Sequence, residues 1–261
     1  MLKVNDTTEN IRSISTGENM GIPKIIHYCW FGNKPMPSSV DKYIESWKKY
    51  LPDFKIMCWN EENFDVASSP YVKSAYEAGK YAFVSDYARL YALKMYGGVY
   101  LDIDVQVMKN FDKLLEYEGI YCFESSEKVM TAFMAASKDN SLINQFLEYY
   151  AERKFDLDKL EPNTVPLTSL LVERGLVLND KNQVLNSNIC VFSNEYFNAY
   201  DFTKAAFRIT ENTYTVHHCL GSWCSPKDRL LFKLKHILSH ILGEESYDRV
   251  KNLKKKVMGE N

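Results

Sequence analysis

The chain has 261 residues, of which 46% are hydrophobic and 14% aromatic, so it can bury a sizeable core and global disorder is excluded. Its formal net charge is only −2, and this balance does not favour a nucleic acid as a partner. The six cysteines contain no C-x-x-C pair and predict buried reduced thiols rather than a zinc site.

The first part of the chain predicts an alternation of strands and helices. After a polar, flexible extension over residues 1–20, a buried strand is expected over 24–30. A helix is expected over 38–51, where apolar residues recur at helical spacing between two prolines. A second strand is expected over 54–59.

The alternation continues with two more helices and a third strand. A short helix is expected over 71–78 and a longer one over 82–96, which Gly97 and Gly98 end. An apolar strand over 97–104 follows directly. This order predicts an α/β fold with a central, mostly parallel sheet and helices on its faces. Ligands of such sheets bind at the carboxyl ends of the strands.

The strand expected over 97–104 ends in two carboxylates, Asp102 and Asp104. Because side chains alternate along a strand, both carboxylates are expected on the same face. Two such groups repel each other unless a cation or hydrogen-bond donors offset the cost, and oxygen ligands suit Mg²⁺ or Mn²⁺. A solvated strand end remains the alternative for this motif taken alone.

The rest of the chain completes one α/β domain. Shorter strands are expected over 120–123, 130–135 and 213–218, and helices over 141–150 and 168–173. No domain boundary is evident before Pro226. The sequence therefore predicts a single domain over 21–225, followed by a helical segment over 226–261.

Polar and aromatic side chains near the expected sheet edge are further candidates. Asp86 and Arg89 lie three residues apart in an otherwise apolar helix, and so on one face of it. They could form an ion pair with each other, or they could bind sugar hydroxyls and phosphate oxygens. Trp30 ends the first strand, where an aromatic ring can stack on a nucleobase or belong to the core.

Two adjacent histidines, His217 and His218, close the last expected strand. Neighbouring side chains of a strand point to opposite faces, so only one of the pair readily joins a site. A neutral imidazole suits Mn²⁺ as a third ligand beside two carboxylates, and a structural role is the alternative.

Several ordered blocks of the sequence resemble the signature of family 32 glycosyltransferases. These are the D-x-D sugar transferases of bacterial capsular polysaccharide and lipopolysaccharide synthesis, related to yeast mannosyltransferases and clostridial glucosylating toxins. The matching blocks are Ile22–Gly32, Ser85–Arg89, Gly97–Asp104, Asn163–Thr168 and His217–Trp223.

The resemblance implies a GT-A type, Rossmann-like fold that binds a nucleotide-sugar donor and uses Mn²⁺ or Mg²⁺. It implies transfer with retention of anomeric configuration, from a UDP-hexose or UDP-N-acetylhexosamine to a growing cell-surface glycan. The acceptor would be an oligosaccharide or a lipid-linked glycan.

The resemblance also implies donor-binding roles for particular residues. Trp30 would stack on the base, and Asp86 and Arg89 would hold the donor sugar and its phosphate. Ser222 and Trp223 would lie near the diphosphate.

By the same resemblance, Asp102 would reach the ribose and a metal-bound water, and Asp104 would bind the metal directly. His218 would be the third metal ligand. Asp102, Asp104 and Arg89 would then carry the catalysis.

The segment over 226–261 combines an apolar helical stripe with a net charge of +4. Such a helix can lie on an anionic membrane surface or pack against the catalytic domain over 21–225. The sequence shows no leader pattern and no apolar run long enough to span a bilayer, so we expect a cytoplasmic protein. The segment over 226–261 adds the expectation of peripheral attachment to the inner face of the cell membrane.

Two other classes of function are alternatives to a glycosyltransferase for this sequence. A haloacid-dehalogenase-like phosphatase also has a strand ending in D-x-D, but it has Thr or Val where this chain has Gln106. A catalytically inactive sugar-binding relative is the second alternative.

Overall fold

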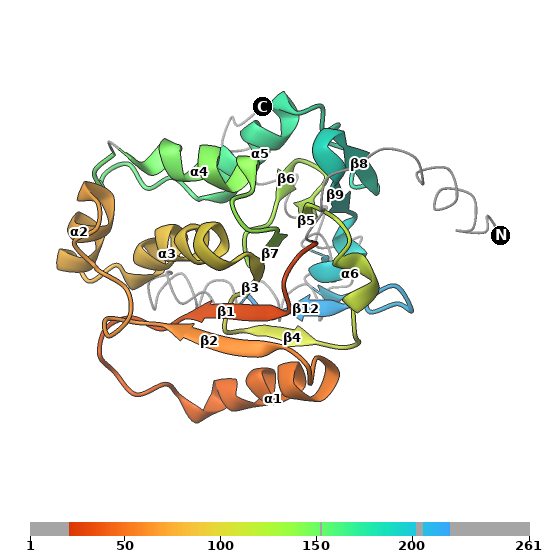
Figure 1. The fold of residues 1–261 in the computed structure, drawn as a ribbon, viewed down its shortest axis with the longest axis horizontal. Coiled ribbons are helices and arrows are strands. Elements are labelled where there is room, and N and C mark those ends of the chain that lie inside the picture. The colour runs from red at the N-terminus through yellow and green to blue at the C-terminus, as the bar shows by residue number, and fades with distance from the viewer. Residues whose placement is uncertain (1–20, 152, 202–205, 220–261) are drawn as a thin grey trace, which may run out of the picture.

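The computed structural model describes residues 21–151, 153–201 and 206–219 (Figure 1). The predicted extension over 1–20 and the predicted helical segment over 226–261 lie outside the described residues, so both stay predictions. Within the described part, no helix is long and apolar enough to cross a membrane.

The N-terminal half alternates strands and helices as the sequence predicts. Its elements are β1 (Ile25–Cys29), η2 (Ser38–Val40), α1 (Asp41–Tyr50), β2 (Lys55–Trp59), α2 (Pro70–Glu77), α3 (Tyr81–Tyr96) and β3 (Gly98–Leu101). β1 pairs in parallel with both β2 and β3, with Ile26 opposite Ile56 and Val99. The predicted parallel arrangement of these strands is confirmed.

Local sequence explains where these helices begin and end. Ser69 caps α2 by accepting a hydrogen bond from the backbone N–H of Val72, and proline occupies the first helical position. Gly97 ends α3 with a φ of 65°, which glycine adopts without strain. At Gly98 a Cβ atom would lie 2.6 Å from the carbonyl oxygen of Ile25, so glycine allows β3 to approach β1.

A buried histidine ties this turn to the first two strands. His27 is fully buried, with Nε2 2.8 Å from the carbonyl oxygen of Gly97, and its Nδ1 accepts a hydrogen bond from the indole N–H of Trp59. Burial lowers the pKa of His27 to about 4. The ring is therefore neutral and links β1, β2 and the end of α3.

The described part of the C-terminal half, up to residue 219, contributes further strands and three helices. The strands are β4 (Val105–Val107), β5 (Gly119–Ser125), β6 (Lys128–Val129), β7 (Phe133–Ala136), β8 (Gln183–Leu185), β9 (Ile189–Phe192), β10 (Tyr200–Asp201), β11 (Ala206–Phe207) and β12 (Thr215–His217). The helices are α4 (Ser141–Ala151), α5 (Thr164–Glu173) and α6 (Asn194–Phe197), and η3 (Asp112–Leu114) and η4 (Asn186–Asn188) are 3₁₀ turns.

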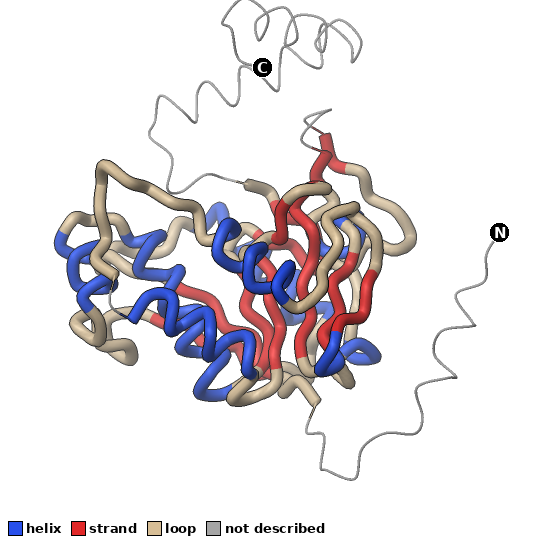
Figure 2. The backbone as a smooth tube through the Cα atoms, turned by 90° about the horizontal axis from the view of Figure 1, so that it is seen from above, coloured by secondary structure: helices blue, strands red, loops and turns tan. Residues whose placement is uncertain are grey.

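Eight strands form the central sheet, with the order β2-β1-β3-β7-β5-β9-β8 and β6 paired to β5. β2, β1, β3, β5 and β9 run in one direction, and β7 and β8 run in the opposite one. Figure 2 shows these strands side by side with helices flanking them. The predicted α/β fold with a mainly parallel sheet is thus confirmed, with antiparallel β7 inserted between β3 and β5.

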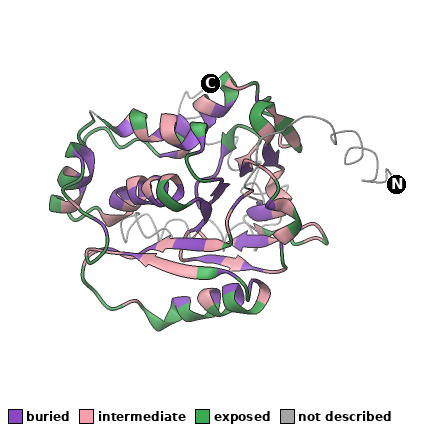
Figure 3. Ribbon diagram, in the orientation of Figure 1, coloured by how far each residue is buried: buried purple, intermediate pink, exposed green. Residues whose placement is uncertain are grey.

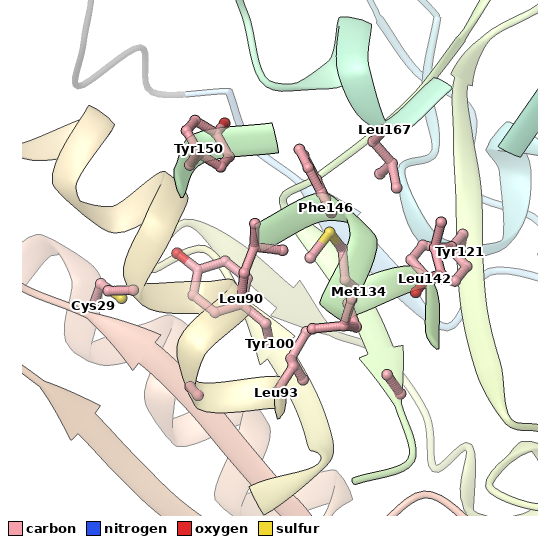
Figure 4. Close-up of a cluster of buried hydrophobic side chains, with 14 of the residues drawn as sticks. Cys29, Leu90, Leu93, Tyr100, Tyr121, Met134, Leu142, Phe146, Tyr150 and Leu167 are labelled. Atoms are coloured by element: carbon pink, nitrogen blue, oxygen red, sulfur yellow. The ribbon is translucent and has the colours of Figure 1, made fainter. Parts of the chain in front are cut away.

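Helices cover both faces of the sheet. α3 and α4 lie above β1, and α1 lies below β2 and β4 (Figure 1). The core on the α3 side includes Leu90, Tyr100, Met134 and Phe146 (Figure 4). The core on the other face gathers around Trp47 and its neighbours. Figure 3 shows that α1 exposes its outer side, as its amphipathic sequence predicts.

Some predicted boundaries were wrong. The strand expected over 97–104 ends at Leu101, because the chain turns there and the N–H of Val105 bonds to the carbonyl oxygen of Asp102. The helix expected over 168–173 begins earlier, at Thr164, with Pro166 inside its first turn, where no backbone donor is needed.

Candidate active site

Three potential ligands converge where β3 ends. One ligand atom each of Asp102, Asp104 and His217 lies within 4.8 Å of the others. The Nε2 atom of His217 is 3.4 Å from Oδ1 of Asp104. Asp104 is buried and Asp102 is partly exposed, so the cluster lies at the edge of the core with access to solvent.

Backbone pairing from two parts of the chain builds this cluster. β4 follows the D-x-D turn and pairs in antiparallel fashion with β12, which places His217 opposite Val105. The N–H of His218 bonds to the carbonyl oxygen of Asp104. The two carboxylates share the site through a turn and not, as predicted, through the alternation of a continuous strand.

The donor set fits a hard or borderline divalent cation. Two carboxylates and one imidazole are ligands that Mn²⁺ accepts, and the carboxylates also suit Mg²⁺. Burial opposes the charge of His217, but Asp104 raises its pKa well above the ordinary value. A metal ion would therefore displace a proton from His217 on binding.

The cluster contains His217 and not His218, the residue predicted as the third ligand. Its Nε2 atom is 3.0 Å from Oε1 of Gln106, and its ring packs 4.9 Å from that of Tyr43. His217 is the last residue of β12 and lies opposite Val105, whereas His218 follows the strand and its side chain contacts Gln106 and Tyr43 instead.

Arg89 connects the D-x-D turn to α3. Its guanidinium lies 2.9 Å from the carboxylate of Asp86 and 3.4 Å from that of Asp102, and it donates to the carbonyl oxygen of Thr131. It also lies over the ring of Tyr100. Burial opposes its charge, but these neighbours raise its pKa, so Arg89 is a fixed cation that bridges the carboxylates of Asp86 and Asp102.

A hydrogen bond from Tyr100 fixes the carboxylate of Asp102. Its hydroxyl donates to Oδ1 of Asp102 over 2.7 Å, and its ring is buried in the core. Tyr100 lies two residues before Asp102, a spacing at which the alternation of a strand predicts that the two side chains share a face.

Asp86 is buried at the centre of a polar network. Burial raises its pKa to about 7, against the opposing effect of Arg89. Its Oδ1 atom accepts a hydrogen bond of 2.6 Å from Nδ2 of Asn163, whose Oδ1 accepts from the hydroxyl of Thr131. Asn163 belongs to a block that the resemblance identified, but only the structure shows its contact with Asp86.

Of the other residues predicted to bind the nucleotide-sugar donor, the structure describes only Trp30. Trp30 follows β1 and is partly exposed, and its indole N–H donates to the carbonyl oxygen of Lys34 over 2.6 Å. It lies at the same edge of the sheet as the D-x-D turn, because β1 and β3 are parallel neighbours. Ser222 and Trp223 lie outside the described residues.

Part of the chain matches a known protein family. Residues 37–121 match the glycosyltransferase sugar-binding region containing the DXD motif. This segment contains Asp86, Arg89 and both D-x-D carboxylates. The chain therefore carries the sugar-binding region of D-x-D glycosyltransferases, and the resemblance predicted from its sequence is confirmed.

Individual proteins are similar over different parts of the chain. Inositol phosphoceramide mannosyltransferase 3 of Schizosaccharomyces pombe is 32% identical over 152 residues, which are 56% of this chain and 41% of that protein. The uncharacterized glycosyltransferase L373 of Acanthamoeba polyphaga mimivirus is 25% identical over 215 residues, 77% of this chain and 84% of that protein. The chain thus spans less than half of the yeast relative.

Two solved structures are also similar. The PaToxG glycosyltransferase is 22% identical, with a TM-score of 0.48 over 59% of this chain and 69% of that one. A glycosyltransferase involved in glycosylating the major capsid of PBCV-1 is 12% identical, with a TM-score of 0.49 over 81% and 100%.

Proposed function

We propose that this protein is a metal-dependent, retaining glycosyltransferase. Its donor would be a UDP-hexose or UDP-N-acetylhexosamine, and its acceptor an oligosaccharide or lipid-linked glycan of the cell surface. The observation that carries the proposal is the convergence of Asp102, Asp104 and His217 beside the Arg89–Asp86 pair, at the sheet edge where nucleotides bind.

The metal site supports the chemistry of the leaving group. A Mn²⁺ or Mg²⁺ ion held by Asp102, Asp104 and His217 would neutralise charge on the departing nucleoside diphosphate. Tyr100 and Arg89 hold Asp102 in a fixed orientation before any ligand arrives, so little reorganisation is required during the reaction.

The polar network around Asp86 indicates how the anomeric configuration of the donor sugar would be retained. Retention through a covalent intermediate would need a carboxylate free to attack the sugar from its far face. Asp86 is buried and bound by Arg89 and Asn163, which is unsuited to a nucleophile. We therefore propose substitution on one face, with the leaving phosphate taking the acceptor proton and the protein supplying position and charge.

The place of action is part of the same proposal. We propose a cytoplasmic enzyme of capsular polysaccharide or lipopolysaccharide synthesis, attached peripherally to the inner face of the membrane through the segment over 226–261. The yeast relative is named for mannosyl transfer involving inositol phosphoceramide, which supports a lipid-linked acceptor here. The phosphatase alternative is not favoured, since the matching family is one of sugar-binding transferases.

The test is release of nucleoside diphosphate from nucleotide sugars, with and without Mn²⁺. We expect the wild type to release it slowly and to lose this activity with EDTA. Asp104→Asn should lower the rate by about 100-fold or more, the size of effect when developing charge loses a partner. Asp53→Asn, at a carboxylate whose side chain is 76% exposed, is the matched control and should leave the rate unchanged.

The outcomes separate the classes of function. Release of inorganic phosphate from phosphate esters would identify a phosphatase. Binding of a nucleotide sugar without any turnover would identify an inactive relative. Undiminished turnover of Asp104→Asn in the presence of Mn²⁺ would contradict the proposed metal site.

A further inference from the structure

A cavity of about 220 Å³ opens beside the polar network, between α2, α3, α4 and the connection to α5. Its volume is below the about 300–1,000 Å³ of pockets for drug-sized ligands, so it suits a single small ring. The apolar part of its wall includes Tyr71, Phe83, Tyr150, Phe155, Leu160 and Pro166. Of these, Tyr150 is seen at the edge of the core cluster in Figure 4.

The cavity also has polar lining residues. The hydroxyl of Tyr149 donates to the carboxylate of Glu161, and Nη1 of Arg153 lies 3.2 Å from the same carboxylate. The guanidinium of Arg153 lies 3.6 Å from the centre of the Tyr149 ring. These groups offer both hydrogen-bond donors and acceptors next to aromatic surface, which is the combination that a hydroxyl-rich ring with an apolar face requires.

The charges along the wall are of both signs. Arg153, Lys154 and Lys159 lie among Asp156 and Glu161. A phosphate or carboxylate ligand would meet the two acids as well as the cations, so the wall does not select an anion. An uncharged ligand with many hydroxyl groups fits this balance better.

α3 connects the cavity to the D-x-D site. Phe83 lies in the cavity wall, Asp86 follows one turn later and Arg89 one turn beyond that. At 1.5 Å of rise per residue, the cavity wall is roughly 5 Å along the helix from Asp86 and about 9 Å from Arg89. Asn163, which donates to Asp86, comes just before Pro166 of the same wall.

We propose that this cavity is the acceptor subsite and binds an uncharged sugar ring of the acceptor glycan. The assignment rests on the proposed transferase function. The ring would stack on the aromatic wall and hydrogen-bond to Arg153 and Glu161.

Sugar binding by the cavity can be measured without any donor. Saturation-transfer NMR would use the methyl glycosides of glucose, galactose, mannose and N-acetylglucosamine as probes of the full-length protein. Leu160→Trp places a large ring at the cavity wall, on a side chain that is 48% exposed. Leu157→Trp is the matched control, because Leu157 is 53% exposed and is not part of the wall.

We expect a signal from at least one glycoside with the wild type and with Leu157→Trp, and at least a fivefold smaller signal with Leu160→Trp. Glu161→Gln, which keeps the shape of the wall, should also weaken binding, whereas Glu173→Gln on the exposed side of α5 should not. No signal with the wild type, or equal signals with both tryptophan variants, would overturn the assignment. So would stronger binding of glucose 1-phosphate than of the glycosides.

Donor hydrolysis separates this proposal from the proposed function. If the subsite serves the acceptor, Leu160→Trp should keep the KM for UDP-glucose and the rate of hydrolysis within about twofold of the wild type. A raised KM for UDP-glucose would show a donor subsite and overturn the acceptor assignment. Absence of hydrolysis by the wild type, together with glycoside binding in the cavity, would refute the transferase and leave a sugar-binding protein.

Discussion

The adjacent histidines offer a direct test of the proposed metal site. We expect His217→Gln to weaken Mn²⁺ binding strongly, because Nε2 of His217 lies with the two D-x-D carboxylates in a single cluster. Loss of a group that only orients a metal ligand typically costs about 10–100-fold in affinity, so loss of the ligand itself should cost at least about 100-fold. Titration calorimetry with Mn²⁺ at pH 7.5 would measure the change.

His218→Gln is the control for this experiment. Its ring faces Gln106 and Tyr43, so the substitution should change Mn²⁺ affinity by less than about threefold. Both variants should melt within a few degrees of the wild type, which circular dichroism would verify. A greater loss of Mn²⁺ affinity in His218→Gln than in His217→Gln would refute the assignment of His217.

Two further predictions concern Arg89 and His27. Arg89→Lys should lower the rate of donor hydrolysis at least tenfold, because an ammonium group cannot span Asp86, Asp102 and the Thr131 carbonyl as the planar guanidinium does; a wild-type rate in steady-state assays would contradict this. The pKa of His27 is lowered from 6.5 to about 4, so between these pH values the native state binds fewer protons than the unfolded state. The contribution of the neutral His27 ring to the free energy of unfolding is therefore complete above pH 6.5 and falls towards pH 4. The stability of the wild type relative to His27→Gln should therefore fall by about 3 kcal/mol from pH 7 to pH 4 in urea unfolding, and an unchanged difference would show that His27 does not titrate in this way.

Much of the fold could be predicted because its signals are local. The apolar run around Ile26, the capping of α2 by Ser69 and the glycine stop after α3 each act within a few residues. Such features determine the type of an element but not its neighbours. The insertion of antiparallel β7 between β3 and β5 was not predicted, since strand order depends on contacts between distant segments.

The sequence by itself determined the chemistry of the site. The residue types of Asp86, Arg89, Asp102 and Asp104, and their positions in the helix before the third strand and at the end of that strand, predicted a cation site, and the family signature added a nucleotide sugar. These inferences depend on short spacings and on the family signature, and they required no knowledge of long-range pairing.

Only the tertiary structure decided which histidine faces the carboxylates. β4 and β12 lie far apart in the sequence, and their register places His217 opposite Val105. A shift of one residue would exchange the two faces of β12 and bring His218 to Asp104 instead. The same holds for the contact of Asn163 with Asp86 and for the cavity near α3, because both arise where separate segments pack together.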